Sequence, residues 1–138
     1  MAMTIVSCST TKRISDEKAE ADIVAVMKMQ ERAWSDGDVY QFMEGYWKSE
    51  DLSFVGKSGI NKGWNTTLNN YIKGYPDKDA MGTLTFEVLE MNRISSDAYH
   101  MIGRYTLVRK IDKPTGLFTL IWKYMDGKWL IVSDHTSG

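Results

Sequence analysis

Residues in the first part of the chain recur at the spacing of an amphipathic helix. Between Ser15 and Gly37, one helical face collects Ile23, Val26, Met27, Gln30, Ala33 and Trp34. Ser15 is followed by two acidic residues and has the side chain of a helix N-cap, and Gly37 stands where helices commonly end in the left-handed conformation. The pattern predicts a helix between these two residues.

Two further helices are predicted before residue 82. Asp38 and Gln41 have the spacing of a capping box, which starts a second helix directly after the first, so that the two form an antiparallel pair. A third helix is expected from about Trp64 to the break at Gly74, with an apolar stripe of Trp64, Leu68, Tyr71, Ile72 and Tyr75. Between these helices, the glycines around Leu52–Val55 indicate one brief strand and a turn.

The chain after Gly82 has the shorter period of β-strands. Four strands are expected, at Thr83–Ile94, Ala98–Lys110, Leu117–Met125 and Lys128–Thr136. Asp126-Gly127 is a strong signal for a two-residue hairpin, and the shift of apolar phase between Val88 and Leu89 indicates a bulge that bends the first strand. Helices followed by strands predict the α+β class, with three N-terminal helices packed on a strongly curved antiparallel β-sheet.

Two of these strands carry apolar side chains on both faces. In the third predicted strand, for example, Leu117 and Ile121 alternate with Phe118, Leu120 and Trp122. Three helices can cover one face of such a sheet, and soluble monomers rarely expose large apolar patches. The preferred interpretation is a homodimer that buries the second face. The alternative is a monomer with scattered apolar residues on its surface.

Composition excludes several classes of function. The 138 residues, 43% hydrophobic and 25% charged, fit one globular domain. A net charge of -1 without a basic run argues against nucleic acid as a partner, and no apolar run approaches the roughly 20 residues of a membrane span. One cysteine, Cys8, and two histidines, His100 and His135, provide neither an internal disulfide nor a metal site. No cofactor is predicted.

The N-terminus has a short pattern of its own. Ile5-Val6-Ser7-Cys8 resembles the recognition box of bacterial lipoproteins, although the seven preceding residues form no complete signal. We therefore expect a flexible tail at 1–14, which is a tether if a signal upstream was trimmed, and one domain at 15–138. The protein is then either cytoplasmic or a periplasmic lipoprotein anchored through Cys8.

The ordered set of features resembles the nuclear transport factor 2-like superfamily. The set consists of the Gly37-Asp38 break, the strand Leu52-Ser-Phe-Val-Gly56, the Gly63-Trp64 pair and the ending Trp129–Gly138. It is most similar to the small SnoaL-like bacterial proteins of unknown function, and its last four residues also resemble the end of the calcium/calmodulin-dependent protein kinase II association domain. The resemblance implies a cystatin-like cone with an internal pocket, and it implies no single activity.

Ketosteroid isomerases of this fold have two catalytic positions that differ in this chain. The resemblance implies a carboxylate base just after the strand that follows the second helix, and a tyrosine in the first helix. The corresponding residues are Val55 or Gly56 and Gln30. Neither Val55 nor Gly56 ionises, and the Gln30 amide cannot transfer a proton. Isomerisation by that mechanism is disfavoured.

His135 and Arg104 are the candidate polar residues of the site. His135 has the strand phase of Trp129 and Ile131, so it is expected to be buried, either as an acid/base or ligand-binding group or as a structural hydrogen-bond donor. Arg104 interrupts an apolar strand and needs an anionic ligand or a carboxylate partner, for which Glu87, Glu90 and Asp134 are available.

Aromatic residues on all the predicted helices and in the sheet indicate a pocket wall, although an ordinary core has the same composition. The predicted ligand-binding residues are Trp34, Tyr46, Trp64, Tyr71 and Trp122, with Arg104 or His135 at the polar end. Binding of a small molecule is the preferred function. The alternatives are an isomerase, cyclase or dehydratase that uses His135 on a small apolar or carbonyl compound, and an oligomeric assembly module.

Overall fold

The computed structural model describes residue 5 and residues 13–138. Most of the predicted tail at 1–14, Cys8 included, lies outside these described residues. Helix α1 spans Asp16–Ser35, and the Ser15 side chain accepts a hydrogen bond from the Lys18 N–H at 3.1 Å. Gly37 follows with a φ of 82°, so both predicted ends of the helix are confirmed.

The segment after α1 is more irregular than predicted. Helix α2, Val39–Phe42, begins at the predicted cap, where the Asp38 side chain accepts a hydrogen bond from the Gln41 N–H at 3.0 Å. It is a single turn followed by the 3-10 turn η1, Met43–Gly45, so the second helix is shorter than predicted. Gly45 lies so close to the buried Gln30 side chain that an added Cβ would be 2.5 Å from its amide nitrogen, and the chain turns away to form a bridge between Tyr46 and Ile131. Helix α3, Trp64–Gly74, is as predicted, and α4, Lys78–Met81, is an additional turn.

Six strands form one sheet in the order β2-β1-β6-β5-β4-β3. Their bounds are Ser53–Gly56 for β1, Gly59–Lys62 for β2, Thr83–Ser95 for β3, Ala98–Val108 for β4, Thr115–Met125 for β5 and Lys128–Thr136 for β6. The predicted antiparallel meander corresponds to β3 to β6. The sheet is not entirely antiparallel, however, because β1 pairs with β6 in parallel, and its partner β2 is a strand that the prediction lacked.

Three register shifts and one tight turn shape the long strands. The pairing of β3 with β4 shifts between Val88 and Glu90, which confirms the bulge predicted from the apolar phase. The same pairing shifts again between Arg93 and Ser95. A third shift, between β5 and β6, leaves Val132 as the extra residue of β6. Asp126 and Gly127 have φ values of 49° and 81°, as a primed hairpin turn requires.

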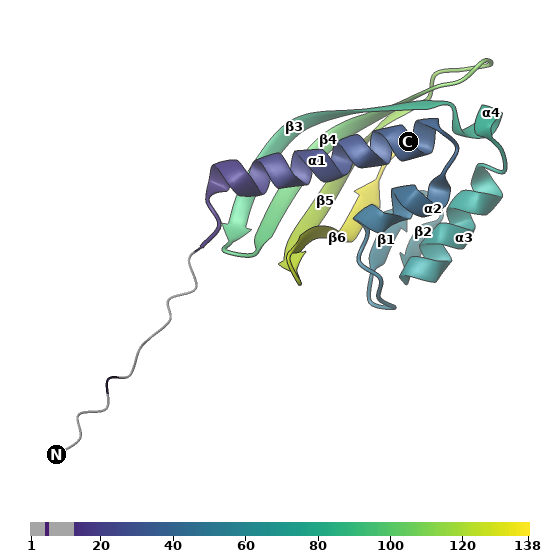
Figure 1. Ribbon diagram of the computed structural model, residues 1–138. Helices are drawn as coiled ribbons and strands as arrows, with labels where there is room; N and C mark the ends of the chain where they lie inside the picture. Colours follow the sequence, from purple (N-terminus) through teal and green to yellow (C-terminus); the bar gives the residue numbers. More distant parts are fainter. Residues whose placement is uncertain (1–4, 6–12) are drawn as a thin grey trace.

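The helices lie on one side of the bent sheet, and α1 runs across its long strands (Figure 1). The α+β class and the helix-covered curved sheet are therefore confirmed. The largest fully buried side chains come from α1, η1, the segment before β1 and strands β4, β5 and β6: Ile23, Gln30, Met43, Leu52, Tyr99, Met101, Trp122 and Ile131. This core fixes the helices against the inner face of the sheet.

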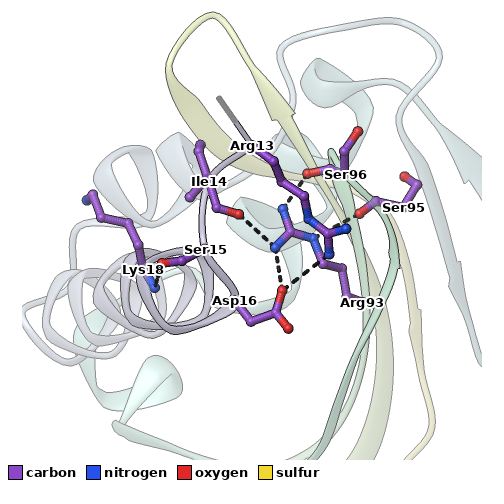
Figure 2. Close-up of polar contacts among 8 residues, drawn as sticks. All are labelled: Arg13, Ile14, Ser15, Asp16, Lys18, Arg93, Ser95 and Ser96. Carbon is purple, nitrogen blue, oxygen red and sulfur yellow. Dashed lines mark hydrogen bonds and ion pairs between the residues drawn. The ribbon is translucent and has the colours of Figure 1, made fainter. Parts of the chain in front are cut away.

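Arg93 of β3 holds the start of α1 against the β3–β4 hairpin (Figure 2). Its guanidinium donates to the Ile14 carbonyl at 2.9 Å and to Asp16 Oδ1 at 2.6 Å. Two further bonds reach the Ser95 and Ser96 carbonyls at 3.1 and 2.6 Å. The hydrogen bond from Arg93 is the main cause that lowers the pKa of Asp16. The planar guanidinium, with its several fixed N–H donors, suits this set of acceptors better than the ammonium group of a lysine would.

Candidate functional site

An aromatic pocket lies between the helices and the inner face of the sheet, and we call it the inner pocket. Its volume is about 100 Å³, and eight of its eleven lining residues are aromatic: Trp34, Phe42, Tyr46, Tyr71, Tyr75, Leu84, Phe86, Tyr105, Leu107, Phe118 and Thr136. The rings pack edge to face, as between Trp34 and Tyr71, whose centroids are 5.4 Å apart. This packing holds the wall in place.

A wider groove on the protein surface adjoins the inner pocket, and we call it the outer groove. It has a volume of about 600 Å³. Tyr71, Tyr75, Tyr105 and Thr136 line both hollows. The remaining wall of the outer groove is more polar and is lined by Phe54, Gly56, Lys57, Ser58, Asn61, Thr67, Asn70 and Gly138. A molecule can therefore place a compact apolar part inside and a polar part in the groove.

The polar end of the inner pocket is a chain of hydroxyl groups backed by a buried carboxyl. Tyr46 Oη donates to Asp134 Oδ2 at 2.7 Å, and Thr136 Oγ1 donates to Asp134 Oδ1 at 2.6 Å. The Tyr71 hydroxyl oxygen lies 3.5 Å from that of Tyr46. Asp134 is 4% exposed and lies behind Tyr46 and Thr136. The arrangement brings together side chains of α3, the segment after η1 and β6.

The bulge at Val132 decides which side chain of β6 faces inward. Before the bulge, Trp129 and Ile131 point into the core; after it, the buried position falls on Asp134 and the next residue, His135, is exposed. The prediction that His135 shares the buried phase of Trp129 and Ile131 is therefore wrong. Strand alternation was assumed to continue, and one extra residue reverses it.

Burial dominates the electrostatics of the polar end. It raises the pKa of Asp134 from its ordinary value of 3.8 to about 6, while the hydrogen bonds from Thr136 and Tyr46 and the nearby His135 act in the opposite direction. Burial, followed by the charge of Asp134, raises the pKa of the Tyr46 and Tyr71 hydroxyls well above their ordinary range. At neutral pH the site therefore contains one ionised carboxylate and two neutral phenols.

The ionised carboxylate determines what the hydroxyls offer to the inner pocket. A carboxylate accepts hydrogen bonds and donates none, so the Tyr46 and Thr136 protons are directed at Asp134. The oxygen lone pairs of these two hydroxyls remain for the inner pocket. The polar end consequently presents hydrogen-bond acceptors to the inner pocket.

The predicted aromatic site residues separate into two groups. Trp34, Tyr46 and Tyr71 line the inner pocket. Trp64 lies away from it, on α3, where its indole N–H donates to the Met43 carbonyl at 2.9 Å. Trp122 is fully buried in the core and lines neither the inner pocket nor the outer groove. The indole of Trp34 also ties α1 to α4, because it donates to the Met81 carbonyl at 2.8 Å.

The two predicted polar residues both lie on the outer face of the sheet. Arg104 is exposed and donates to Glu87 Oε2 at 2.7 Å, so the interpretation as an ion pair with Glu87 is the one that the structure supports. His135 lines a shallow hollow with Ile102, Leu117 and other residues of that face. Neither side chain lies in the wall of the inner pocket.

Sequence reasoning missed Asp134 and Thr136 as site residues. The sequence carries no clear signal for Asp134, because Trp129–Val132 is a continuous apolar run in which no alternation is visible. In β3, by contrast, the apolar phase slips at Val88 and Leu89, and this slip did predict the bulge. No comparable signal pointed to Thr136, whose role depends on its distance from Asp134 in the folded chain.

The part of the chain that the structure describes contains neither a cluster of metal-ligand side chains nor a membrane-spanning helix. In residues 5 and 13–138, no three His, Cys, Asp or Glu side chains gather in a way that could hold a metal ion. None of the described helices combines the length and hydrophobicity of a membrane span.

Solved structures with the same architecture come from several bacteria. An NTF-2 like protein of unknown function from Shewanella oneidensis MR-1 is 41% identical, with a TM-score of 0.84 over 87% of this chain and 99% of the other. A domain of unknown function with a cystatin-like fold from Nostoc punctiforme is 17% identical, with a TM-score of 0.73 over 90% and 78% of the two chains.

A third similar structure is a putative calcium/calmodulin dependent protein kinase II association domain from Xanthomonas campestris. It is 14% identical, with a TM-score of 0.66 over 99% of this chain and 97% of the other. At such low identity, this similarity and that to the Nostoc domain concern the fold alone. No protein-family model and no curated protein matches the chain.

The raised pKa of Asp134 predicts how stability depends on pH. Between about pH 4 and pH 6 the folded state holds this proton more tightly than the unfolded state. The stabilisation is therefore complete below the ordinary pKa of 3.8 and is lost as the pH rises through about 6. Asp134→Asn keeps an acceptor oxygen and cannot ionise. Its free energy of unfolding, relative to wild type, should increase by about 2 kcal/mol from pH 4 to pH 7.

Urea unfolding of both proteins at several pH values measures this difference, and the other carboxyl groups contribute equally to both. A difference that stays constant with pH, or that decreases as the pH rises, would contradict the raised pKa.

Proposed function

This chain belongs to the nuclear transport factor 2-like family, and we propose that within this family it is a binding domain for a small, mainly apolar molecule that enters the inner pocket. The observation that carries this proposal is the lining of the inner pocket: eight aromatic rings and two leucines surround one polar end. Ligand sites in proteins combine such apolar walls with a few polar groups that fix orientation.

The size of the inner pocket supports a compact ligand group. Its volume of about 100 Å³ is somewhat below the roughly 150 Å³ of an engineered cavity that binds benzene. A branched alkyl group or a single small ring is therefore the appropriate occupant. Any larger ligand extends past Tyr71 and Thr136 into the outer groove.

The polar end favours binding over catalysis. Among the described residues that line the inner pocket, the titratable groups are tyrosines, and burial raises the pKa of three of them, Tyr46, Tyr71 and Tyr105. Asp134 is the group that titrates near neutral pH, yet Tyr46 and Thr136 stand between it and the inner pocket. A general acid or base must reach the reacting atom directly or through one water. His135 lies on the opposite face.

We further propose that the outer face of the sheet forms a homodimer. Cross-strand rows on this face place Ile102 beside Thr119, and Ile121 between His100 and Ser133. Leu117 is 46% exposed on the same face. Apolar residues surrounded by polar ones are typical of interface anatomy. The alternative is a larger ring of subunits, as an assembly module would form. The similarity in fold to an association domain favours that alternative.

Filling the inner pocket should weaken the binding of a compact apolar probe. A suitable probe is the carbon isostere of choline, a neutral alcohol with a tert-butyl group. Leu107→Phe adds volume inside the inner pocket and should weaken the affinity by about tenfold or more, since overpacking costs on the order of 1–3 kcal/mol. Leu117→Phe is the matched control on the outer face and should bind as wild type does.

NMR titration measures both affinities and maps the shifted signals. Equal binding by Leu107→Phe and wild type would exclude the inner pocket as the ligand site.

A charge on the outer face should separate the proposed dimer. Ile121→Arg places an unpaired cation where two apolar faces meet, so the sedimenting species should change from dimer to monomer. Val24→Arg makes the same change on α1, where Val24 is 37% exposed, and should leave the dimer intact. Analytical ultracentrifugation at micromolar concentration distinguishes the two. A monomeric wild-type protein would refute the dimer.

A further inference from the structure

We propose that the inner pocket selects the positively charged head of a small organic ammonium compound. This inference rests on the proposed function, since it names the chemical class of the molecule that the inner pocket binds. Two independent features support it: a buried carboxylate whose partners are uncharged, and a wall made almost entirely of aromatic rings.

The negative charge behind the polar end has no cation to balance it in the inner pocket. Both hydrogen-bond partners of Asp134, Tyr46 and Thr136, are neutral hydroxyls, and both direct their protons away from the inner pocket. Among the described residues, no lysine, arginine or histidine lines the inner pocket. A buried charge without a partner is costly, and a bound cation lowers that cost. An anionic ligand would be repelled.

Aromatic walls add a second attraction for a cation of this kind. The negative faces of tryptophan, tyrosine and phenylalanine rings attract ammonium groups, and the attraction is stronger where water is excluded. Methylated ammonium groups suit such walls because their charge is spread over apolar methyl groups that need no hydrogen bonds. The volume of about 100 Å³ fits a compact branched head of this type.

The rest of the ligand would lie in the outer groove. Tyr71, Tyr75, Tyr105 and Thr136 line both hollows, so a substituent on the head passes between them. Lys57, Asn61 and Asn70 further out provide donors for a hydroxyl, carboxylate or ester group. The ligand class is therefore a small ammonium compound with a short polar tail.

Protonation of Asp134 should weaken the binding of a cation. The titratable groups nearest to it are Tyr46, Tyr71 and His135. The two tyrosines stay neutral because burial raises their pKa, and the side chain of His135 lies on the outer face. The residues opposite Asp134 on β1 and β5 are a phenylalanine and a leucine. A change of affinity near pH 6 therefore reports on Asp134.

Choline and its neutral carbon isostere test this selection directly. The two molecules have almost the same shape and differ in charge, and neither titrates between pH 5 and pH 8, so a pH effect must come from the protein. At about pH 8, wild type should bind choline at least about fivefold more tightly than the isostere. The preference should decrease several-fold at about pH 5, where Asp134 is protonated.

Two variants separate the contributions. Asp134→Asn should lose most of the preference for choline at about pH 8 and still bind the isostere. His135→Ala should keep both the preference and its pH dependence. If the isostere binds to the inner pocket and choline binds no better, or if Asp134→Asn keeps the preference, the cation inference is overturned while the proposed function stands. If neither molecule binds to wild type, the proposed function itself fails.

Discussion

The hydrogen bond between the Tyr46 hydroxyl and the Asp134 carboxyl joins the two parts of this fold. Tyr46 follows the turns after α1 and bridges to β6, while Asp134 belongs to β6 near the centre of the sheet. The 2.7 Å contact satisfies a carboxyl that would otherwise be buried without a partner. It also aligns Tyr46 with Tyr71 of α3, so the inner pocket acquires its polar end where helices and sheet meet. The same hydrogen bond thus determines where the polar end of the inner pocket lies and which groups it contains.

This arrangement stabilises the fold less than an uncharged residue would. An asparagine or a protonated carboxyl at position 134 keeps acceptor capacity without the cost of a buried charge, whereas the ionised form is disfavoured by burial. Residues that reduce stability are characteristic of binding and catalytic sites. The charge of Asp134 is therefore best explained by a ligand that benefits from it. The Arg93 cluster shows the contrasting case, in which a buried charge is fully paired and serves the scaffold.

Local sequence signals predicted the elements of this fold but only part of its site. The Ser15 cap, the turn at Asp126 and the bulge after Val88 depend on a few adjacent residues, and the structure contains all three. The family resemblance is confirmed as well. Side-chain burial was harder to predict, because one extra residue at Val132 exchanged the faces of Asp134 and His135. Pocket and core aromatics cannot be separated by type either, since Trp34 and Trp122 differ in tertiary position alone.

The titration of the Asp134 carboxyl is the most direct test of this account. The carboxyl carbon signal of Asp134, identified by its loss in Asp134→Asn, can be followed by NMR across the acidic and neutral pH range. The account predicts a midpoint at about 6 for the free protein and a lower midpoint when choline is bound, since a neighbouring cation favours the ionised form. A midpoint at or below the ordinary 3.8 in the free protein, or a midpoint that rises when choline binds, would contradict it.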